Sequence, residues 1–345
     1  MKSFRINLLP GDGIGVDVVQ EGCRLLSALA QFHGGLEFKF QTFDWSCRYY
    51  LEHGRMMPPD GLTRLADCNA ILLGAVGFPG VPDHISLREL LLPIRTGFDQ
   101  YVNMRPIKLL PGLVSPLKND KIDFVVIREN SEGEYCGRGR SDENGAVQEA
   151  VFTRKGTERI IRYAFEYAQA NGMTRVLSAT KSNALNHSMV FWDKIFHEVK
   201  SRYPSMDSRQ MHIDALAGFF IMHPERLQMV VASNLFGDIL TDLGSAMLGS
   251  IGISPSGNIN PEGTYPSMFE PIHGSAPDIA GKGIANPAGT FWAIAMMLEQ
   301  LHEKPAADLL MEAMCKVLRE GKTVTPDIGG KGTTSGMTDA VIAAL

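Results

Sequence analysis

Two acidic side chains, Asp238 and Asp242, stand four residues apart in a segment, 231–242, that has the character of a helix start. Four residues make about one helical turn, so both carboxylates should lie on one face. Like charges at this spacing destabilise a helix by roughly 0.2–0.5 kcal/mol, and a divalent cation would remove that repulsion. Because carboxylate oxygens are hard ligands and no Cys or His stands beside them, the pair favours Mg²⁺ or Mn²⁺ over Zn²⁺. Two solvated acids on a surface helix are the alternative interpretation.

A second candidate is the glycine-rich turn Gly11-Asp12-Gly13-Ile14-Gly15. It follows a predicted strand and precedes a predicted helix, with Asp44 at the end of a second strand. The dinucleotide fingerprint requires a sixth-position glycine, where this chain has Val16, and Asp12 would place a carboxylate beside a pyrophosphate. By itself the turn therefore indicates only a tight turn near a ligand.

The elements that must position these residues alternate between strand-like and helix-like runs. Strands are predicted at 4–9, 36–43, 70–74, 124–127, 175–179 and 229–232. Helices are predicted at 17–30, 156–170, 188–202, 289–301 and 306–319, the last ending before Gly321. This alternation predicts an α/β protein.

Two further segments are predicted to be irregular or exposed. Residues 249–289 are rich in Gly, Pro, Ser and Asn, which predicts a long loop, and loops of this length are usually functional. This loop would carry Glu270, His273 and Asp278. Residues 136–152 are polar and glycine-rich at first, and predict a protruding hairpin.

Composition excludes several classes of protein. The chain has 345 residues, of which 44% are apolar, enough for two domains or one large one. Its net charge of −5 and the lack of a basic run argue against nucleic-acid binding. No signal peptide or membrane span is evident, so we expect a cytoplasmic protein without a membrane partner. The five scattered cysteines form no CxxC pair and predict reduced thiols.

Several motifs in a fixed order resemble the β-decarboxylating dehydrogenases, the family of isocitrate, isopropylmalate, tartrate and D-malate dehydrogenases. The resemblance runs nearly from end to end. The segments that carry it are Pro10-Gly11-Asp12-Gly13-Ile14-Gly15, Leu91-Leu92-Pro93-Ile94-Arg95, Asn103-Met104-Arg105-Pro106, Arg128-Glu129-Asn130 through Tyr135, Thr180-Lys181-Ser182-Asn183, Asn234 through Asp242, and His273 through Asp278. Residues 81–87 and 98–103 resemble the tartrate and D-malate branch more than the isopropylmalate branch.

The resemblance implies a two-domain isopropylmalate dehydrogenase-like fold that is not a Rossmann fold. Residues 1–98 and 251–345 would form a large cofactor-binding domain, and residues 99–250 a smaller domain that makes a homodimer. The hairpin after Tyr135 would clasp the partner subunit. The active site would lie between the domains and would be completed by the partner.

The reaction that the resemblance implies removes a proton and a hydride from a 2-hydroxy acid, then CO₂, and returns a proton to C3. Arg95, Arg105 and Arg128 are expected to bind the two substrate carboxylates, since guanidinium groups hold carboxylates bidentately. The resemblance also implies Lys181, from the partner subunit, as the base for the hydroxyl proton. Tyr135 is implied as the acid that reprotonates C3.

The resemblance extends the metal site by one ligand. Asp214, given by the other subunit, is implied beside Asp238 and Asp242. A cation held there would chelate the substrate hydroxyl oxygen and the C1 carboxylate. The choice between Mg²⁺ and Mn²⁺, and the need for K⁺, stay open.

The resemblance implies NAD rather than NADP. Asp278 corresponds to the position whose carboxylate binds the adenosine ribose hydroxyls in NAD-using members, and it would repel a 2′-phosphate. The Lys-Tyr pair typical of NADP-dependent isocitrate dehydrogenases is replaced by Asp278-Ile279. The other residues expected at the cofactor are Ile14, Glu270, His273, Gly274, Ser275, Ala276 and Asn286, with Asn183 from the partner subunit.

Substrate choice depends on the positions just before Arg95. Leu91 and Leu92 stand where isocitrate enzymes carry polar side chains, so isocitrate is disfavoured. Apolar walls would accept isopropyl, methyl or hydrogen on C3 and do not by themselves explain a hydroxyl, so the preference for D-malate or tartrate comes from the resemblance of residues 81–87 and 98–103. Arg88, seven residues before Arg95, is expected on the same helical face, where it would contact a polar C3 substituent or the cofactor; a surface charge is the alternative. Two further interpretations are 3-isopropylmalate dehydrogenase and a non-catalytic regulatory subunit. The presence of every arginine, acid and metal position argues against the regulatory subunit.

Overall fold

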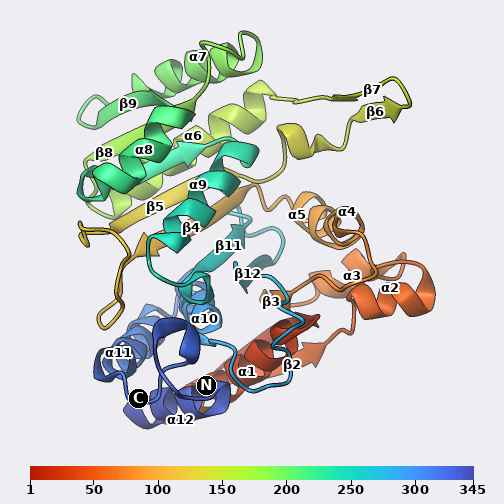
Figure 1. Cartoon of the computed structure of the whole chain (residues 1–345), viewed down its shortest axis with the longest axis vertical. Coiled ribbons are helices and arrows are strands. Elements are labelled where there is room, and N and C mark those ends of the chain that lie inside the picture. The colour runs from red at the N-terminus through yellow and green to blue at the C-terminus, as the bar shows by residue number, and fades with distance from the viewer. The chain divides into compact units, whose positions relative to one another are not determined.

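The computed structural model describes all 345 residues, which form two compact units (Figure 1). Unit 1 comprises residues 1–100, 110–114 and 249–345, and unit 2 comprises residues 101–109 and 115–248. Each unit contains a sheet with helices packed on it, so the predicted α/β class is confirmed. Among the helices, none combines the length and apolar character that crossing a membrane requires.

The strands of unit 1 lie in the order β2 (Leu36–Thr42), β1 (Lys2–Gly11), β3 (Ala70–Ala75), β12 (Ser267–Pro271) and β11 (Pro255–Ile259). All are parallel to their neighbours except β11, which runs antiparallel to β12. Every residue of β3 is buried, as expected for a central strand with helices on both faces. Successive side chains of β3 point to opposite faces of the sheet, so they pack in two different cores.

One face of this sheet is covered by α1 (Ile14–His33) and α10 (Ala288–Gln300), with α11 (Lys304–Glu320) and α12 (Thr334–Ala344) packed against them. Gly321 ends α11 in the left-handed conformation, at φ 66°, as the sequence predicts. On the other face, Ile71 and Leu73 of β3 pack in a core with Trp45 and Ile94. That core also receives α2 (Cys47–His53) and α3 (Gly61–Ala66).

The helix that carries Arg95 is not a regular α-helix. It consists of α4 (Asp83–Ser86), a π-helical turn at Leu87–Leu91 and α5 (Leu92–Gly97). A π turn takes one more residue than an α turn, so it rotates the residues before it relative to those after it. The prediction that Arg88 and Arg95 share one helical face assumed an unbroken α-helix, and that assumption is wrong.

The strands of unit 2 lie in the order β4 (Val102–Lys108), β5 (Asp123–Glu129), β10 (Met229–Ala232), β8 (Arg175–Thr180) and β9 (Asp207–His212). Only β4 and β5 are antiparallel. Helices α6 (Arg154–Ala170) and α7 (Ser188–Lys200) pack together against this sheet. Helices α8 (Ile213–Met222) and α9 (Asn234–Ala246) form a second pair that also packs against it.

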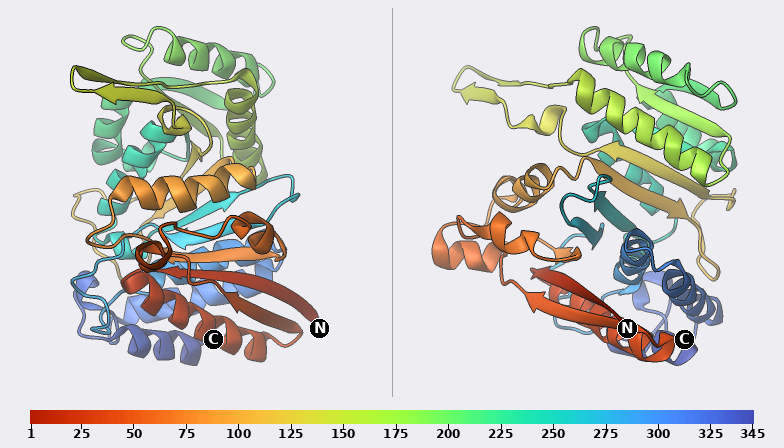
Figure 2. Two further views of the ribbon diagram at one scale, coloured as in Figure 1. Left: turned by 90° about the vertical axis from the view of Figure 1, so that its right-hand side faces the viewer. Right: turned by 180° about the vertical axis from the view of Figure 1, so that it is seen from behind.

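A separate hairpin leaves unit 2 between β5 and α6. It pairs β6 (Gly139–Asp142) with β7 (Gly145–Gln148), and all eight residues are exposed. Figure 2 shows the two strands extending away from the helices of this unit. The predicted protruding hairpin is therefore present.

The predicted strands and helices are all found within a few residues of their expected bounds. The long loop predicted at 249–289 is wrong in part, because β11 and β12 are both fully buried strands within it. Their inward side chains include Ser256, Asn258 and Glu270, which satisfy one another or their neighbours through hydrogen bonds. Buried polar strands of this kind lack the apolar pattern by which strands are recognised.

Candidate active site

The two candidate arginines of unit 2 are placed side by side by the register of β4 and β5. Arg105 lies opposite Val126, and Arg128 is two residues further along the same strand. Residues opposite each other, and those two positions away, share one face of an antiparallel pair. Both guanidinium groups are therefore directed to the face that α9 covers, and both side chains are less than 10% exposed.

Helix α9 can approach β4 and β5 closely because it has glycine at the two positions that face the side chains of Arg128 and Ile107. A Cβ on Gly237 would lie 2.6 Å from Cβ and 2.7 Å from Cγ of Arg128, and one on Gly244 would overlap Ile107. Gly237 and Gly244 are seven residues apart and so face the sheet together. The polar face of the same helix carries Asn234, Asp238 and Thr241.

Arg128 is held at the first two turns of α9. Its Nε and Nη2 donate to Asn234 Oδ1 at 3.0 and 2.7 Å, and its Nη1 donates to Asp238 Oδ1. Asn234 in turn donates to the carbonyl of Glu132 at 3.2 Å. These contacts fix the plane of a guanidinium that is only 2% exposed.

Arg105 contacts the next turn of the helix. Its Nη1 donates to Thr241 Oγ1 at 2.6 Å and lies 3.6 Å from Asp238 Oδ1 and 3.7 Å from Asp242 Oδ1. Burial raises the pKa of Asp242, Arg105 opposes this, and the neighbouring Asp238 adds to it. The two acids thus share one helical face, as the spacing predicts, and each lies near an arginine.

Tyr135 reaches this cluster from a short 3-10 helix, Glu134–Cys136, that follows β5. Its hydroxyl donates to Asp238 Oδ2 at 2.9 Å, and the Arg128 guanidinium lies 5.5 Å from the centre of its ring. A phenol beside a carboxylate and two guanidinium groups can give a proton to a substrate and regain it from the same network. The structure therefore brings four predicted residues of unit 2 together: Arg105, Arg128, Tyr135 and Asp238.

Lys181 and Asp214 form a pair at the carboxyl ends of β8 and β9. These strands are parallel with Thr180 opposite His212, so the residues that follow them meet. Lys181 Nζ donates to Asp214 Oδ1 at 2.6 Å, which lowers the pKa of Asp214. No group of three His, Cys, Asp or Glu residues in the chain is arranged to hold a metal ion. Within one chain, Asp214 thus pairs with Lys181 instead of joining Asp238 and Asp242.

Arg95 of unit 1 has an acidic partner of its own. Its Nη2 donates to Glu270 Oε1 at 3.2 Å, and the same oxygen accepts from Asn258 Nδ2 at 2.7 Å. The side chains of Arg95 and Glu270 are 7% and 9% exposed, so this is a buried ion pair. Arg95 Nε is buried without a hydrogen-bond partner, which leaves one donor for a ligand. Glu270, expected at the cofactor, lies against the candidate substrate-binding arginine.

The side chains expected to select the substrate differ in exposure. Leu91 and Leu92 are half-buried at the junction of the π turn and α5, whereas Arg88 is exposed. Because Arg88 lies within the π turn, a shared face with Arg95 no longer follows from their seven-residue spacing.

The candidate cofactor loop, 273–286, packs against the glycine turn at the start of α1. Ile14 N donates to the Ser275 carbonyl at 2.8 Å, and a Cβ on Gly13 would overlap that oxygen. Ala276 has φ 38°, a left-handed conformation that is strained for alanine and is found mainly where the surrounding structure imposes it. The turn and the loop therefore form one rigid surface.

The polar groups of this loop differ in burial and in their hydrogen-bond partners. His273 Nδ1 interacts with the Gly274 carbonyl at 3.0 Å, its Nε2 is buried without a partner, and burial lowers its pKa. Asp278 is exposed. Asn286 is already committed, because it donates to Asp327 at 2.9 Å and accepts from the first amide of α10. Asn183, in unit 2, is exposed just after β8.

Asp12 has a structural role that the sequence did not reveal. Its carboxylate accepts from the backbone N–H groups of Cys47, Arg48 and Gly77 at 3.0 to 3.4 Å. Two of these amides begin α2, so Asp12 caps a helix that lies far away in sequence. The carboxylate in the glycine-rich turn is thus explained without a bound ligand.

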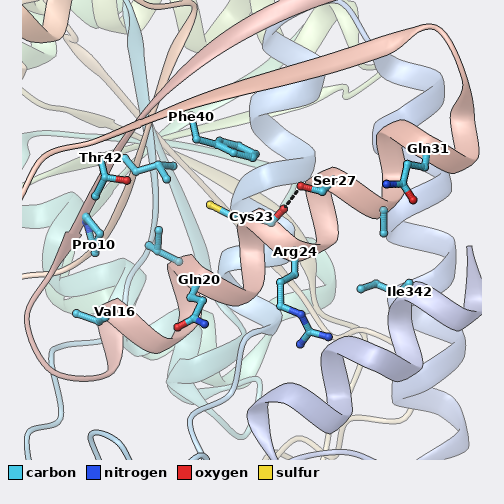
Figure 3. Close-up of a pocket in the computed structure, with 13 residues that line it drawn as sticks. Pro10, Val16, Gln20, Cys23, Arg24, Ser27, Gln31, Phe40, Thr42 and Ile342 are labelled. Atoms are coloured by element: carbon cyan, nitrogen blue, oxygen red, sulfur yellow. Dashed lines mark hydrogen bonds between the residues drawn. The ribbon is translucent and has the colours of Figure 1, made fainter.

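Two cavities lie in unit 1, one at the glycine-rich turn and one along α1. A cavity of about 510 Å³ borders the 11–13 turn, Phe43, Asp44 and Pro277. Another, of about 670 Å³, runs along α1 between β2 and α12, with Val16, Cys23 and Phe40 in its wall (Figure 3). No candidate substrate, metal or cofactor residue lines either cavity.

Comparison with known proteins agrees with the motifs and the geometry. The family profile "Isocitrate/isopropylmalate dehydrogenase" matches residues 5–341. The chain is 52% identical to a protein of Bacillus subtilis (strain 168) named "Probable tartrate dehydrogenase/decarboxylase", covering 100% of this chain and 99% of the relative. It is 49% identical to "D-malate dehydrogenase [decarboxylating]" of Escherichia coli (strain K12), covering 99% and 98%.

A solved structure confirms the fold. The isocitrate dehydrogenase from Methylococcus capsulatus superposes with a TM-score of 0.89 at 32% identity, covering 99% of both chains. The expected isopropylmalate dehydrogenase-like fold is thereby confirmed, and the enzyme interpretation prevails over the regulatory-subunit interpretation because these relatives are dehydrogenases. From its motifs, its fold and its relatives, this chain belongs to the isocitrate/isopropylmalate dehydrogenase family and is a decarboxylating dehydrogenase.

Proposed function

We propose that the protein oxidises and decarboxylates a (2R)-malate-type 2-hydroxy acid with NAD and a divalent metal ion, and that D-malate or tartrate is its substrate. The observation that carries the proposal is the contact of Tyr135, Arg128 and Asp238 in unit 2, which joins a proton donor, a carboxylate-binding group and a metal-type ligand. The names of the two relatives described above support the choice of substrate.

The residues of the chain divide the reaction between them. Arg95, Arg105 and Arg128 bind the two carboxylates and hold C2 and C3 in place. Lys181 of the partner subunit accepts the hydroxyl proton of the substrate. NAD, when bound, would supply the acceptor for the hydride of C2. The C3 carboxylate then leaves as CO₂, and the Tyr135 hydroxyl gives its proton to C3.

Asp238 and Asp242 fit a divalent cation. They are hard oxygen donors one helical turn apart on one face of α9. Asp214 of the partner subunit would be the third ligand. When bound, Mg²⁺ or Mn²⁺ would stabilise negative charge on the C2 oxygen.

The cofactor loop fits NAD. The unpartnered His273 Nε2 and the exposed Asp278 carboxylate offer an acceptor each, and ribose hydroxyls are donors. Ile14, Gly274, Ser275 and Ala276 would provide the wall, with Asn286 holding the loop at the start of α10. Asn183 of the partner subunit would complete the cofactor site. If the reaction requires a monovalent ion, we expect K⁺.

A homodimer would supply the partner residues. Unit 2 exposes apolar side chains on α8 and α9, with Ile221 39%, Met222 63% and Ile239 55% exposed. Side chains of this kind on adjacent helices are typical of a subunit interface. The β6–β7 hairpin would be the clasp, and the five cysteines, none of which is in a disulfide, suit the reducing cytoplasm.

The substrate is tested by measuring NADH formation with Mn²⁺ and K⁺ on D-malate, the tartrate isomers, 3-isopropylmalate and isocitrate. We expect turnover of D-malate or tartrate at least tenfold faster than of the others. Preference for 3-isopropylmalate would assign the chain to that activity instead. Replacing Arg88 with Trp should change the relative rates on D-malate and tartrate, and unchanged rates would exclude it from specificity.

A further inference from the structure

The turn that carries Tyr135 is hydrogen-bonded to the end of β7 and to the residues that follow it. At one end of the turn, Gly133 and Val151 exchange two backbone hydrogen bonds, of 2.8 and 3.2 Å. At the other end, Glu149 N donates to the Arg138 carbonyl at 3.0 Å. Residues 133–138 therefore form a loop that is closed at both ends by residues 149–151, which follow β7.

The middle of the loop is held by the side chain of Gln148. Its Nε2 donates to the Glu134 carbonyl at 2.8 Å and to the Arg138 carbonyl at 3.1 Å. These two carbonyls lie on either side of Tyr135 in the sequence. Since a primary amide nitrogen has two hydrogens, Gln148 can serve both acceptors at once.

Two further hydrogen bonds hold the turn: Cys136 N donates to the Gly133 carbonyl at 3.3 Å, and Cys136 Sγ donates to the Glu149 carbonyl at 3.4 Å. Gly137 takes the left-handed conformation at φ 75°, so the backbone turns sharply just after Tyr135. The Tyr135 hydroxyl must nevertheless keep its 2.9 Å contact with Asp238. A small rotation of the turn would move that hydroxyl by an ångström or more.

We infer that Gln148 is a positioning residue for Tyr135, so that the hairpin sets the place from which the proton is delivered to C3. The inference rests on the acid role proposed for Tyr135. Gln148 itself touches neither Tyr135 nor Asp238 through its side chain amide; it acts through the two backbone carbonyls of the turn. Nothing in the sequence marks it, because it is an exposed residue of an exposed strand.

The test compares two variants at Gln148, Gln148→Ala and Gln148→Glu, with Asn144→Ala as the control. Asn144 lies at the tip of the hairpin, between β6 and β7, and outside the turn that carries Tyr135. In the full-length dimer, Gln148→Ala should lower kcat by roughly tenfold or more, since misplacing a catalytic group by about 1 Å costs up to a hundredfold, with KM changed less than about twofold. Gln148→Glu should lower kcat further, because a carboxylate would face two carbonyl oxygens. Asn144→Ala should keep kcat, and light scattering should show every variant as the same oligomer.

A double-mutant cycle separates positioning from general damage. If Gln148 acts through Tyr135, Gln148→Ala should cost kcat less than about twofold in a Tyr135→Phe background. An equal loss in both backgrounds, or no loss in either, would overturn the inference while leaving the acid role of Tyr135 intact. A Tyr135→Phe protein with unchanged kcat would remove that acid role, and this inference with it.

Hydrogen exchange supplies a readout that is independent of turnover. The amides of residues 134–138 should exchange faster in Gln148→Ala than in the unchanged protein, while those of α9 should not change. Unchanged exchange in 134–138 would show that Gln148 does not brace the turn.

Discussion

The hydroxyl of Tyr135 lies 2.9 Å from Oδ2 of Asp238, so a proton donor and a candidate metal ligand are in direct contact. The other carboxylate oxygen of Asp238 accepts from Arg128. Each oxygen of one aspartate is thus engaged by a different residue of the site. A change at Asp238 should therefore disturb proton delivery, substrate binding and metal binding together.

Asp238→Asn is expected to lower kcat/KM by at least about a hundredfold, because it removes a charged ligand and the partner of Arg128. Metal binding gives a second readout. Mn²⁺ should raise the melting temperature of the unchanged protein but not that of Asp238→Asn. Asp123→Asn, an exposed carboxylate in an ion pair with Lys108, is the matched control and should keep both properties. Equal Mn²⁺ stabilisation of the two variants would argue against a metal at Asp238.

Gly237→Ala should destabilise the protein by about 1–3 kcal/mol, because its Cβ would overlap the side chain of Arg128 and force α9 outward. Gly218 of α8 is the matched control. A Cβ there meets only Met222 Cε, at 3.7 Å, so Gly218→Ala should be neutral or stabilising by up to about 1 kcal/mol. Urea unfolding of both variants measures the difference. Similar midpoints would mean that α9 does not need glycine at 237.

Glu270→Ala should lower the free energy of unfolding by about 3–5 kcal/mol, because it leaves the Arg95 guanidinium buried without its acidic partner. The control is Glu37→Ala, because Glu37 is a partly exposed glutamate whose Oε2 lies 3.4 Å from Lys39 Nζ, and its loss should leave the urea midpoint unchanged. Added D-malate should restore more stability to Glu270→Ala than to the unchanged protein, since its carboxylate would replace Glu270. If D-malate stabilises Glu270→Ala and the unchanged protein equally, Arg95 does not bind the substrate.

Asp278→Ser should raise the ratio of kcat/KM for NADP to that for NAD by at least about tenfold, since it removes a charge that would repel the 2′-phosphate. The fold should be unaffected, because Asp278 is exposed. The kinetic constants for the two cofactors measure the change. A ratio that stays constant would place the adenosine ribose elsewhere.

Burial raises the pKa of Cys23, Cys47 and Cys68 to about 12 in each case. Only the thiolate reacts with iodoacetamide, so a thiol whose pKa is raised in this way reacts much more slowly than a free thiol. Peptide mass spectrometry of the native protein should find these three cysteines unmodified after a treatment that labels the urea-unfolded chain. Rapid native labelling of any of them would show that its helix or loop opens readily.

The sequence predicts those elements whose apolar pattern is strong and local. The β3 and β10 strands and the α6 and α10 helices are found where they are expected. The sequence predicts a loop where β11 and β12 lie, because their buried side chains include the polar residues Ser256, Asn258 and Glu270. Such residues are satisfied by partners that are distant in sequence, and no local pattern reveals those partners.

The residues of the site also divide into those that a local pattern predicts and those that depend on contacts between distant parts of the chain. The shared face of Asp238 and Asp242 follows from helical spacing alone. The pairing of Arg95 with Glu270 depends on two strands and a helix meeting, and the helix-capping role of Asp12 depends on the approach of α2. The π turn before Arg95 cannot be predicted from a period of 3.6 residues per turn, so the spacing of Arg88 and Arg95 alone does not fix their relative directions.

The central claim is that this chain couples oxidation to loss of CO₂ at a site that needs a divalent cation. The most direct test measures NADH and CO₂ together from D-malate and L-tartrate, with Mn²⁺ and then with EDTA. We predict one CO₂ per NADH on at least one of these substrates and loss of both products in EDTA, restored by added Mn²⁺. Turnover that persists in EDTA, or NADH without CO₂, would contradict the account.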